Sequence, residues 1–147
     1  MKIDGYKELM SKFENLEKFT EKGIEKGLQK GSLRVVADAV MKLNSSTDGK
    51  GILAAHISAE VEKTKSRVGT NTKYAPYVEM GTGLFAVNDD GRKDVPWRYQ
   101  DAEGKWHSTS GQHPKPFLQP ALDANRNVIP KDVREGVRKT LKELCKK

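Results

Sequence analysis

Three glycines spaced four residues apart, Gly23, Gly27 and Gly31, interrupt a stretch that is otherwise typical of one long amphipathic helix. From about residue 4 to residue 43, apolar side chains recur at intervals of three and four, which is the spacing of one helix face. A glycine inside a helix costs about 1 kcal/mol relative to alanine, so three of them require a reason. Either the helix breaks near Gly31, or another backbone approaches the stripe closely. We favour the break.

The middle of the chain favours strands, because apolar and polar residues alternate there. Two alternating segments are each followed by turn-forming residues and by a shorter partner strand. A segment with helical spacing lies between the two pairs and stops at glycines. The predicted elements are strands 57–62 and 66–70 around a turn at 63–65, a helix at 74–80, and strands 95–100 and 105–109 around a turn at 101–104.

The remaining connections follow from proline, glycine and polar residues. Residues 44–50 are polar and end in Asp-Gly-Lys, which predicts a loop. Pro114-Lys115-Pro116 predicts a stiff extended segment that leads into a basic C-terminal helix over about 117–145. Pro130 lies inside that helical pattern, so the helix should kink or restart there.

Length and composition limit the class of protein. The 147 residues suit one domain, 1–147, and the single cysteine, Cys145, excludes an intrachain disulfide or a multi-cysteine metal site. No apolar run approaches the length of a membrane span, and the N-terminus lacks a signal-peptide pattern. We therefore expect no membrane partner and synthesis in a reducing cytoplasm. Most of the formal charge of +7 lies from Arg126 onward, where there are eight basic residues and three acidic ones.

The sequence carries no signature of an enzyme. There is no phosphate-binding loop, and His56, His107 and His113 lie far apart with no cysteine cluster. We expect no catalytic residue, no metal and no cofactor. Glu79 is unusual because it lies in an apolar stretch, and we expect its carboxylate to be bonded to backbone amides or to a basic partner.

A small basic nucleic-acid-binding protein is the alternative from another functional class. The isoelectric point is about 9.4, and basic side chains surround aromatic ones in the second strand pair, a combination that can stack bases and neutralise phosphates. The same aromatics also suit packing against a neighbouring subunit. The residues concerned are Arg92, Lys93, Arg98 and Lys105 around Trp97, Tyr99 and Trp106.

Two separated motifs decide between these classes. The first runs from Asn71 to Gly83 and contains Tyr-Ala-Pro-Tyr-Val-Glu-Met-Gly-Thr; the second, at 116–122, reads Pro-Phe-Leu-Gln-Pro-Ala-Leu. In this order they resemble the tailed-phage tail-component family typified by gene product ten of Hong Kong phage ninety-seven, whose members are encoded among head–tail joining and tail-completion genes. The resemblance covers roughly residues 5–145. The long 85–112 segment, Pro130 and the sequence at 51–57 depart from the family pattern.

The resemblance implies a structural role for the motif residues and no catalysis. We expect Tyr74, Tyr77 and Val78 to pack a short helix on the sheet, Gly81 and Gly83 to stop it with positive backbone angles, and Phe117 and Leu118 to anchor the last helix. The full set of structural motif residues is Tyr74, Ala75, Tyr77, Val78, Glu79, Gly81, Thr82, Pro116, Phe117, Leu118, Pro120 and Ala121.

The fold expected is α+β, with one small antiparallel sheet of about four strands, and with a long N-terminal helix and a C-terminal helix packed on one face. The function expected is a structural protein of the virion neck or tail, assembled in the bacterial cytoplasm as a ring, with six-fold order suggested by related tails. Its expected partners are identical subunits, the head connector, and tail-tube or tail-terminator proteins, with non-specific contact to channel DNA. The candidate interface residues are Trp97, Tyr99 and Trp106 in the 85–112 hairpin, and Arg134 and Arg138 in the basic helix.

Overall fold

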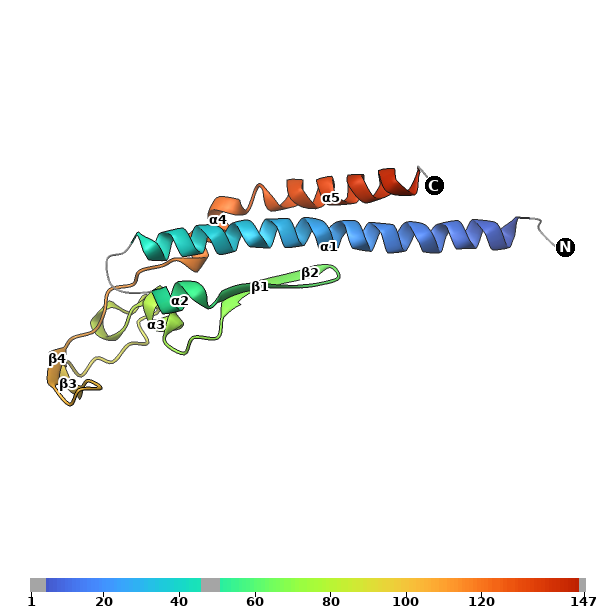
Figure 1. The fold of residues 1–147 in the computed structure, drawn as a ribbon. Helices are drawn as coiled ribbons and strands as arrows, with labels where there is room; N and C mark the ends of the chain where they lie inside the picture. Colours follow the sequence, from blue (N-terminus) through green and yellow to red (C-terminus); the bar gives the residue numbers. More distant parts are fainter. Residues whose placement is uncertain (1–4, 46–50, 146–147) are drawn as a thin grey trace. The chain divides into compact units, whose positions relative to one another are not determined.

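The computed structural model describes residues 5–45 and 51–145 and has an α+β fold (Figure 1). The long N-terminal helix, the C-terminal helix and the two strand pairs confirm that part of the prediction. Residues 46–50 of the predicted loop lie outside the described residues. The elements are α1 (Tyr6–Asn44), α2 (Gly51–Ala55), β1 (Ile57–Glu62), β2 (Lys65–Thr70), α3 (Ala75–Met80), the 3-10 turn η1 (Gly83–Phe85), β3 (Trp97–Gln100), β4 (Trp106–Thr109), α4 (Leu118–Asn125) and α5 (Ile129–Leu144).

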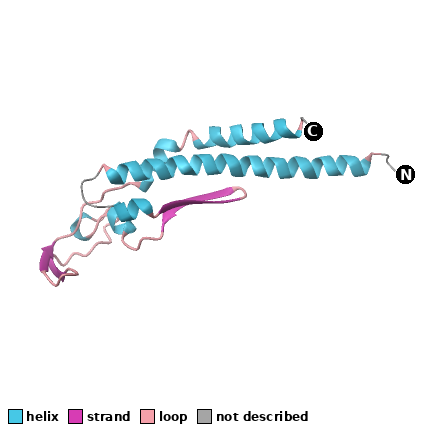
Figure 2. Cartoon of the chain, in the orientation of Figure 1, coloured by secondary structure: helices cyan, strands magenta, loops and turns pink. Residues whose placement is uncertain are grey.

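The four strands form two separate two-stranded sheets, β1–β2 and β3–β4, so the prediction of a single four-stranded sheet is wrong (Figure 2). Alternation along the chain identifies each strand and its neighbour in sequence, but it does not show which outer edges pair. Here the backbone at the base of the β3–β4 hairpin forms hydrogen bonds with the turn that follows α3. The amides of Thr82 and Leu84 donate to the carbonyls of Gln112 and Ser110, at 2.9 and 3.1 Å.

The glycine stripe does not break the first helix, and the favoured prediction of a break near Gly31 is wrong. The helix α1 is continuous over 39 residues, and α5 runs antiparallel beside it. A Cβ added at Gly23 would lie 2.5 Å from the Cα of Val137, and one at Gly27 would lie 2.8 Å from the carbonyl of Asp132. The glycines are therefore needed because a second backbone approaches closely, which outweighs their low helix propensity.

The C-terminal helical pattern restarts at Pro130, as predicted. The helix α4 ends at Asn125 and α5 begins at Ile129, so the proline occupies the first turn of α5, where its missing amide proton is tolerated. The buried side chain of Asn125 fixes this junction. Its amide nitrogen donates to the carbonyl of Ala121 at 2.9 Å and to the carboxylate of Asp38 on α1 at 2.5 Å.

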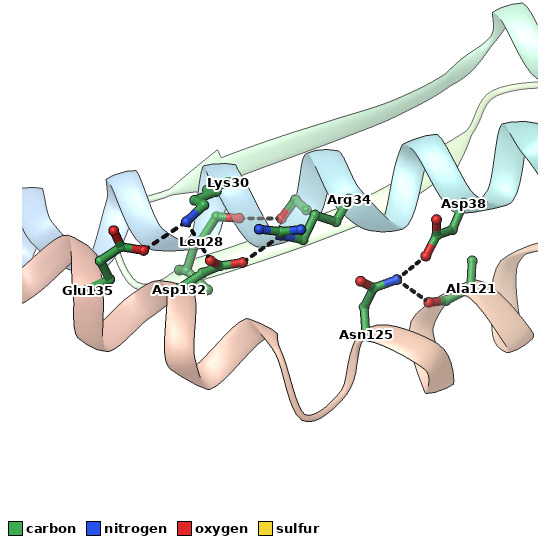
Figure 3. A network of polar contacts seen from close by, with 9 residues as sticks. Leu28, Lys30, Arg34, Asp38, Ala121, Asn125, Asp132 and Glu135 are labelled. Carbon is green, nitrogen blue, oxygen red and sulfur yellow. Dashed lines mark hydrogen bonds and ion pairs between the residues drawn. The ribbon is translucent and has the colours of Figure 1, made fainter.

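The chain divides into two compact units. The first comprises α1 as far as Asp38, the strands over Ser58–Gly69, and the chain from Ala121 onward; the second comprises Ala39–Ile57 and Thr70–Pro120. In the first unit, α1 lies between α5 and the β1–β2 hairpin (Figures 1 and 3). Each unit has its own buried side chains, and a single domain over 1–147 stays a prediction. Buried apolar residues include Val35 and Ala121 in the first unit, and Ala39, Leu43, Leu53, Ile57, Ala75, Val78 and Phe117 in the second.

Candidate functional site

The two sequence motifs meet at the carboxylate of Glu79. This side chain leaves α3 and accepts hydrogen bonds from the backbone amides of Phe117 and Leu118, at 2.8 and 3.0 Å, and of Gln119 at 2.9 Å. These amides are at the start of α4, where the helix itself offers them no acceptor and where a negative charge is favourable. Of the two partners expected for Glu79, backbone amides or a basic side chain, the structure shows the amides, and the second motif supplies them.

The turn after α3 brings the two ends of the 85–112 segment together. Gly81 and Gly83 have φ of 75° and 60°, the left-handed region that glycine adopts most easily. Between them, Thr82 exchanges two hydrogen bonds with Gln112, each of 2.9 Å. The amide of Lys115 then donates to the carbonyl of Val78 at 2.8 Å. The first motif is therefore joined to the second through backbone bonds as well as through Glu79.

The apolar motif residues divide into buried and exposed sets. Val78 is buried as expected, but Tyr74 and Tyr77 are exposed, and Tyr77 retains 59% of its accessible surface. The expectation that both tyrosines pack against a sheet is wrong, because both side chains remain largely exposed. The other motif residues are buried at Ala75, Phe117 and Ala121, half-buried at Leu118 and Pro120, and exposed at Pro116.

The aromatic residues of the β3–β4 hairpin lie on both of its faces. The register opposes Trp97 to Thr109, Tyr99 to His107 and Gln100 to Trp106, which places Trp106 on the face opposite Trp97 and Tyr99. Trp97 is half-buried against the Gly83 turn, with a guanidinium 5.4 Å from its ring centroid. Trp106 is 59% exposed. The three aromatics proposed as one set of anchors are therefore not on one surface.

The basic partners of these rings come from the hairpin and its lead-in. Arg92 lies over Trp97, and Arg98 lies 5.5 Å from the ring centroid of Trp106. The ring of Tyr99 stacks on His107 with centroids 5.3 Å apart. The arginines and aromatics that the sequence grouped thus contact one another within the chain.

Two of the three histidines contact side chains of the second unit. A ring nitrogen of His107 lies 2.7 Å from a carboxylate oxygen of Asp101 in the β3–β4 turn. That hydrogen bond, followed by the amide of Lys105, lowers the pKa of Asp101 below its ordinary value. His113 stacks on Phe85 with centroids 3.7 Å apart. Within residues 5–45 and 51–145, no group of three His, Cys, Asp or Glu side chains could hold a metal ion. No described helix is both long and apolar enough to cross a membrane.

The sequence matches a protein family over residues 7–81, from the second residue of α1 to the turn after α3. The family is described as "Bacteriophage HK97-gp10, putative tail-component". The chain belongs to this HK97-gp10-like family. No curated protein and no solved structure gives a significant match. The family description names a tail component, which supports a structural role in a phage virion, in contact with other virion proteins.

The matched region of this HK97-gp10-like protein ends two residues after Glu79, whereas the amides that Glu79 binds lie beyond it. The helix α5 also lies outside the match, yet it packs on matched residues of α1. The contacts of Glu79 and of the glycine stripe therefore connect the residues that match the family to residues beyond the match.

An ion-pair network joins α1 to α5 in this tail-component protein (Figure 3). The carboxylate of Asp132, which is only 4% exposed, binds Lys30 at 2.8 Å and Arg34 at 2.9 Å. Hydrogen bonding from Lys30, then from Arg34, lowers the pKa of Asp132, although burial opposes the shift. Glu135 binds Lys139 and Lys30, each at 2.8 Å, and these bonds lower its pKa to about 2. Arg134 and Arg138, the predicted interface cations, are exposed on α5.

Exposed apolar side chains gather on the first turns of α1, a surface that the sequence did not reveal. Leu9 and Phe13 are 53% and 58% exposed, and Tyr6, Met10 and Leu16 also lie open on α1. The antiparallel register pairs Gly31 with Ile129, Gly27 with Val133 and Gly23 with Val137, so these earlier turns run past the end of α5 (Figure 1). The signal was available as the spacing of residues 6, 9, 13 and 16, which continues the glycine stripe toward the N-terminus.

Proposed function

We propose that this tail component is a neck or tail-completion protein and that identical subunits form a ring at the head–tail junction. The family match over residues 7–81 carries the proposal. The exposed apolar residues of α1 and the exposed indole of Trp106 support it, since assembly proteins bury such surfaces against neighbours. A head-to-tail interface between identical subunits gives a ring when the rotation closes, and we propose six-fold order.

The proposed ring has neighbours on both sides. On one side lies the head connector, and on the other the tail-tube or tail-terminator protein. The basic α5, with Arg134 and Arg138 exposed, is proposed to face an acidic neighbour or to contact channel DNA without sequence preference. The protein would assemble in the host bacterial cytoplasm and remain in the virion.

The hairpin is proposed as a contact between rings, with Trp106 as its anchor. Its ring is largely exposed and needs no rearrangement to reach a neighbour. Trp97 is less suited, because it packs against the Gly83 turn. Replacing Trp106 by alanine should weaken assembly while the purified chain stays folded, whereas Trp97→Ala should also loosen the turn.

The proposal is tested by negative-stain microscopy of the purified protein and of particles made by a phage that lacks its gene. Rings of the purified protein support it. In the deletion, free heads beside free tails indicate joining, and tails of uncontrolled length indicate termination; both outcomes support a neck or tail-completion role. Normal virions made without the protein would contradict it.

Nucleic-acid binding is tested in the same preparation by titrating salt. Affinity for duplex DNA that is high at low salt and collapses by physiological salt is the behaviour of a basic nucleic-acid-binding protein. If that binding accompanied normal particles from the deletion phage, it would favour the alternative function over a virion role.

A further inference from the structure

A groove on the first unit has an apolar floor and a basic rim. It lies along α5, has a volume of about 790 Å³, and its floor is formed by Ile24 of α1 with Val133, Val137 and Leu141 of α5. Lys131, Arg134 and Arg138 stand at its edge. Glu135 also lines it, but that carboxylate is already bound by Lys30 and Lys139. The groove thus presents uncovered apolar surface with positive charge beside it.

The exposed half of α1 has the opposite charge. A shallow depression on it is lined by the apolar side chains of Met10, Phe13 and Leu16. The charged residues at this depression are all acidic, namely Glu14, Glu17 and Glu21. Lys22 and Lys26 fall on the opposite side of the helix by its 3.6-residue period, whereas Lys18 lies beside Glu14, one turn away.

We infer that the exposed half of α1, residues 6–20, docks into the α1–α5 groove of a second copy of this chain. Apolar residues of one copy cover apolar residues of the other, and the glutamates at the edge of α1 meet the arginines at the rim of the groove. The lengths agree, since the 16 residues of α5 span about 24 Å and residues 6–20 about 22 Å at the helical rise. This inference rests on the proposed ring and names the interface that would build it.

The pairing is head-to-tail, because the donor helix and the groove are different surfaces of one chain. Each copy then offers one donor and one groove, so association continues from subunit to subunit until a ring closes. An alternative in which two α1 helices pair with each other would be self-complementary and would stop at a dimer.

Two charge-reversed variants of the full chain test the docking. The donor variant carries Glu14→Lys with Glu17→Lys, and the groove variant carries Arg134→Glu with Arg138→Glu. Each places like charges in contact, so each alone should weaken self-association at least about tenfold. Mixed together they should associate again, because both alternating contacts then pair opposite charges. Sedimentation velocity over a range of concentrations measures the association of each variant and of the mixture.

The matched control is Lys22→Glu with Lys26→Glu, which reverses charges on the far side of α1 and should associate like the wild type. Recovery of assembly in the mixture alone would establish the docking. Unchanged association of the groove variant would overturn it, and so would a wild-type dimer that only the donor variant disrupts. A wild-type chain that stays monomeric at every concentration would overturn it too.

Complementation of the deletion phage separates this inference from the proposed function. If both variants restore normal particles while the deletion leaves unjoined heads and tails, the docking is wrong and the virion role stands. If the deletion itself has no effect on particles, the virion role is wrong whatever the sedimentation shows.

Discussion

Along α1, residues 23–34 lie against α5, whereas residues 6–16 carry exposed apolar side chains on a continuation of the same stripe. In the covered stretch the repeat positions are glycines, and the two backbones approach until no side chain fits between them. In the uncovered stretch the repeat positions are Tyr, Leu and Phe, which are suited to a partner with a wider groove. Side-chain size along one stripe thus separates an intramolecular contact from an open surface.

The largest expected effect is that of adding one methyl group to the covered stretch. In Gly27→Ala the new Cβ meets backbone atoms of Asp132 and Val133, which cannot move unless α5 moves. The free energy of unfolding, measured by urea denaturation, should fall by about 3 kcal/mol, despite the better helix propensity of alanine. Gly51→Ala is the control, because no atom lies within 4 Å of its added Cβ, and it should cause no loss.

The ion pairs across the covered stretch should matter somewhat less. Asp132→Asn removes the charge that Lys30 and Arg34 bind, and should lower the free energy of unfolding by about 2 kcal/mol near neutral pH. The pKa values of Asp132 and Glu135 are lowered in the folded chain, so the unfolded chain binds protons first as the pH falls. Stability should therefore decrease from about pH 4.5 toward pH 2. The asparagine variant should show a shallower decrease, and identical slopes would remove Asp132 from this account.

A contact outside α1 provides a reference for these magnitudes. In Glu79→Ala the amides of Phe117, Leu118 and Gln119 lose their acceptor, which should cost about 1.5 kcal/mol. Glu79→Gln retains an acceptor oxygen and should cost less. Thermal unfolding of the two variants checks the order, and equal losses would mean that charge rather than hydrogen bonding dominates.

Gly31→Ala should have a much smaller effect than Gly27→Ala. The three atoms nearest its added Cβ all belong to the side chain of Ile129, the closest at 3.2 Å, and that side chain can shift slightly. The gain in helix propensity then offsets the tight contact, and the net change should be below about 1 kcal/mol. A loss as large as that at Gly27 would show that the close approach extends along the whole stripe.

The smallest effect on the monomer is expected in the uncovered stretch. Phe13 is largely exposed, so Phe13→Ser should leave the thermal midpoint of the dilute chain unchanged while reducing self-association. A substantial drop in the midpoint of the dilute monomer would show that this stretch is part of a folded core, and the distinction between the two halves of α1 would fail.

Local pattern was sufficient for most elements of this fold. The strand at 57–62, the turn at 101–104 and the restart at Pro130 all depend on neighbours in sequence, and all were confirmed. The strand predicted at 95–100 was confirmed over residues 97–100. The prediction failed where distant segments meet. The glycine stripe was consistent with a break or with a close neighbour, and only the position of α5 decides between them. Pairing of sheet edges likewise depends on Thr82 meeting Gln112, thirty residues away in sequence.

The candidate site divides in the same way. The chemistry of Glu79 required a partner, and the sequence left backbone amides and a basic side chain open; the structure shows the amides of Phe117, Leu118 and Gln119. The exposure of Tyr77 depends on which segments pack near it, which composition does not reveal. The opposite faces of Trp97 and Trp106 follow from the register of the hairpin, which places Trp106 opposite Gln100. The sequence showed the apolar spacing along α1, but it did not show which of these residues are exposed. That depends on where α5 ends, because α5 covers only part of α1.

The closed base of the 85–112 segment has a consequence for how this chain can change. Thr82 with Gln112, Leu84 with Ser110, and Val78 with Lys115 hold the two ends of the segment together without using its tip. The hydrogen bonds at the base therefore offset the entropy cost of closing the loop, and lengthening the loop adds little to that cost. The tip can be exchanged for a foreign loop or peptide tag while the base stays intact, which makes it a natural grafting position.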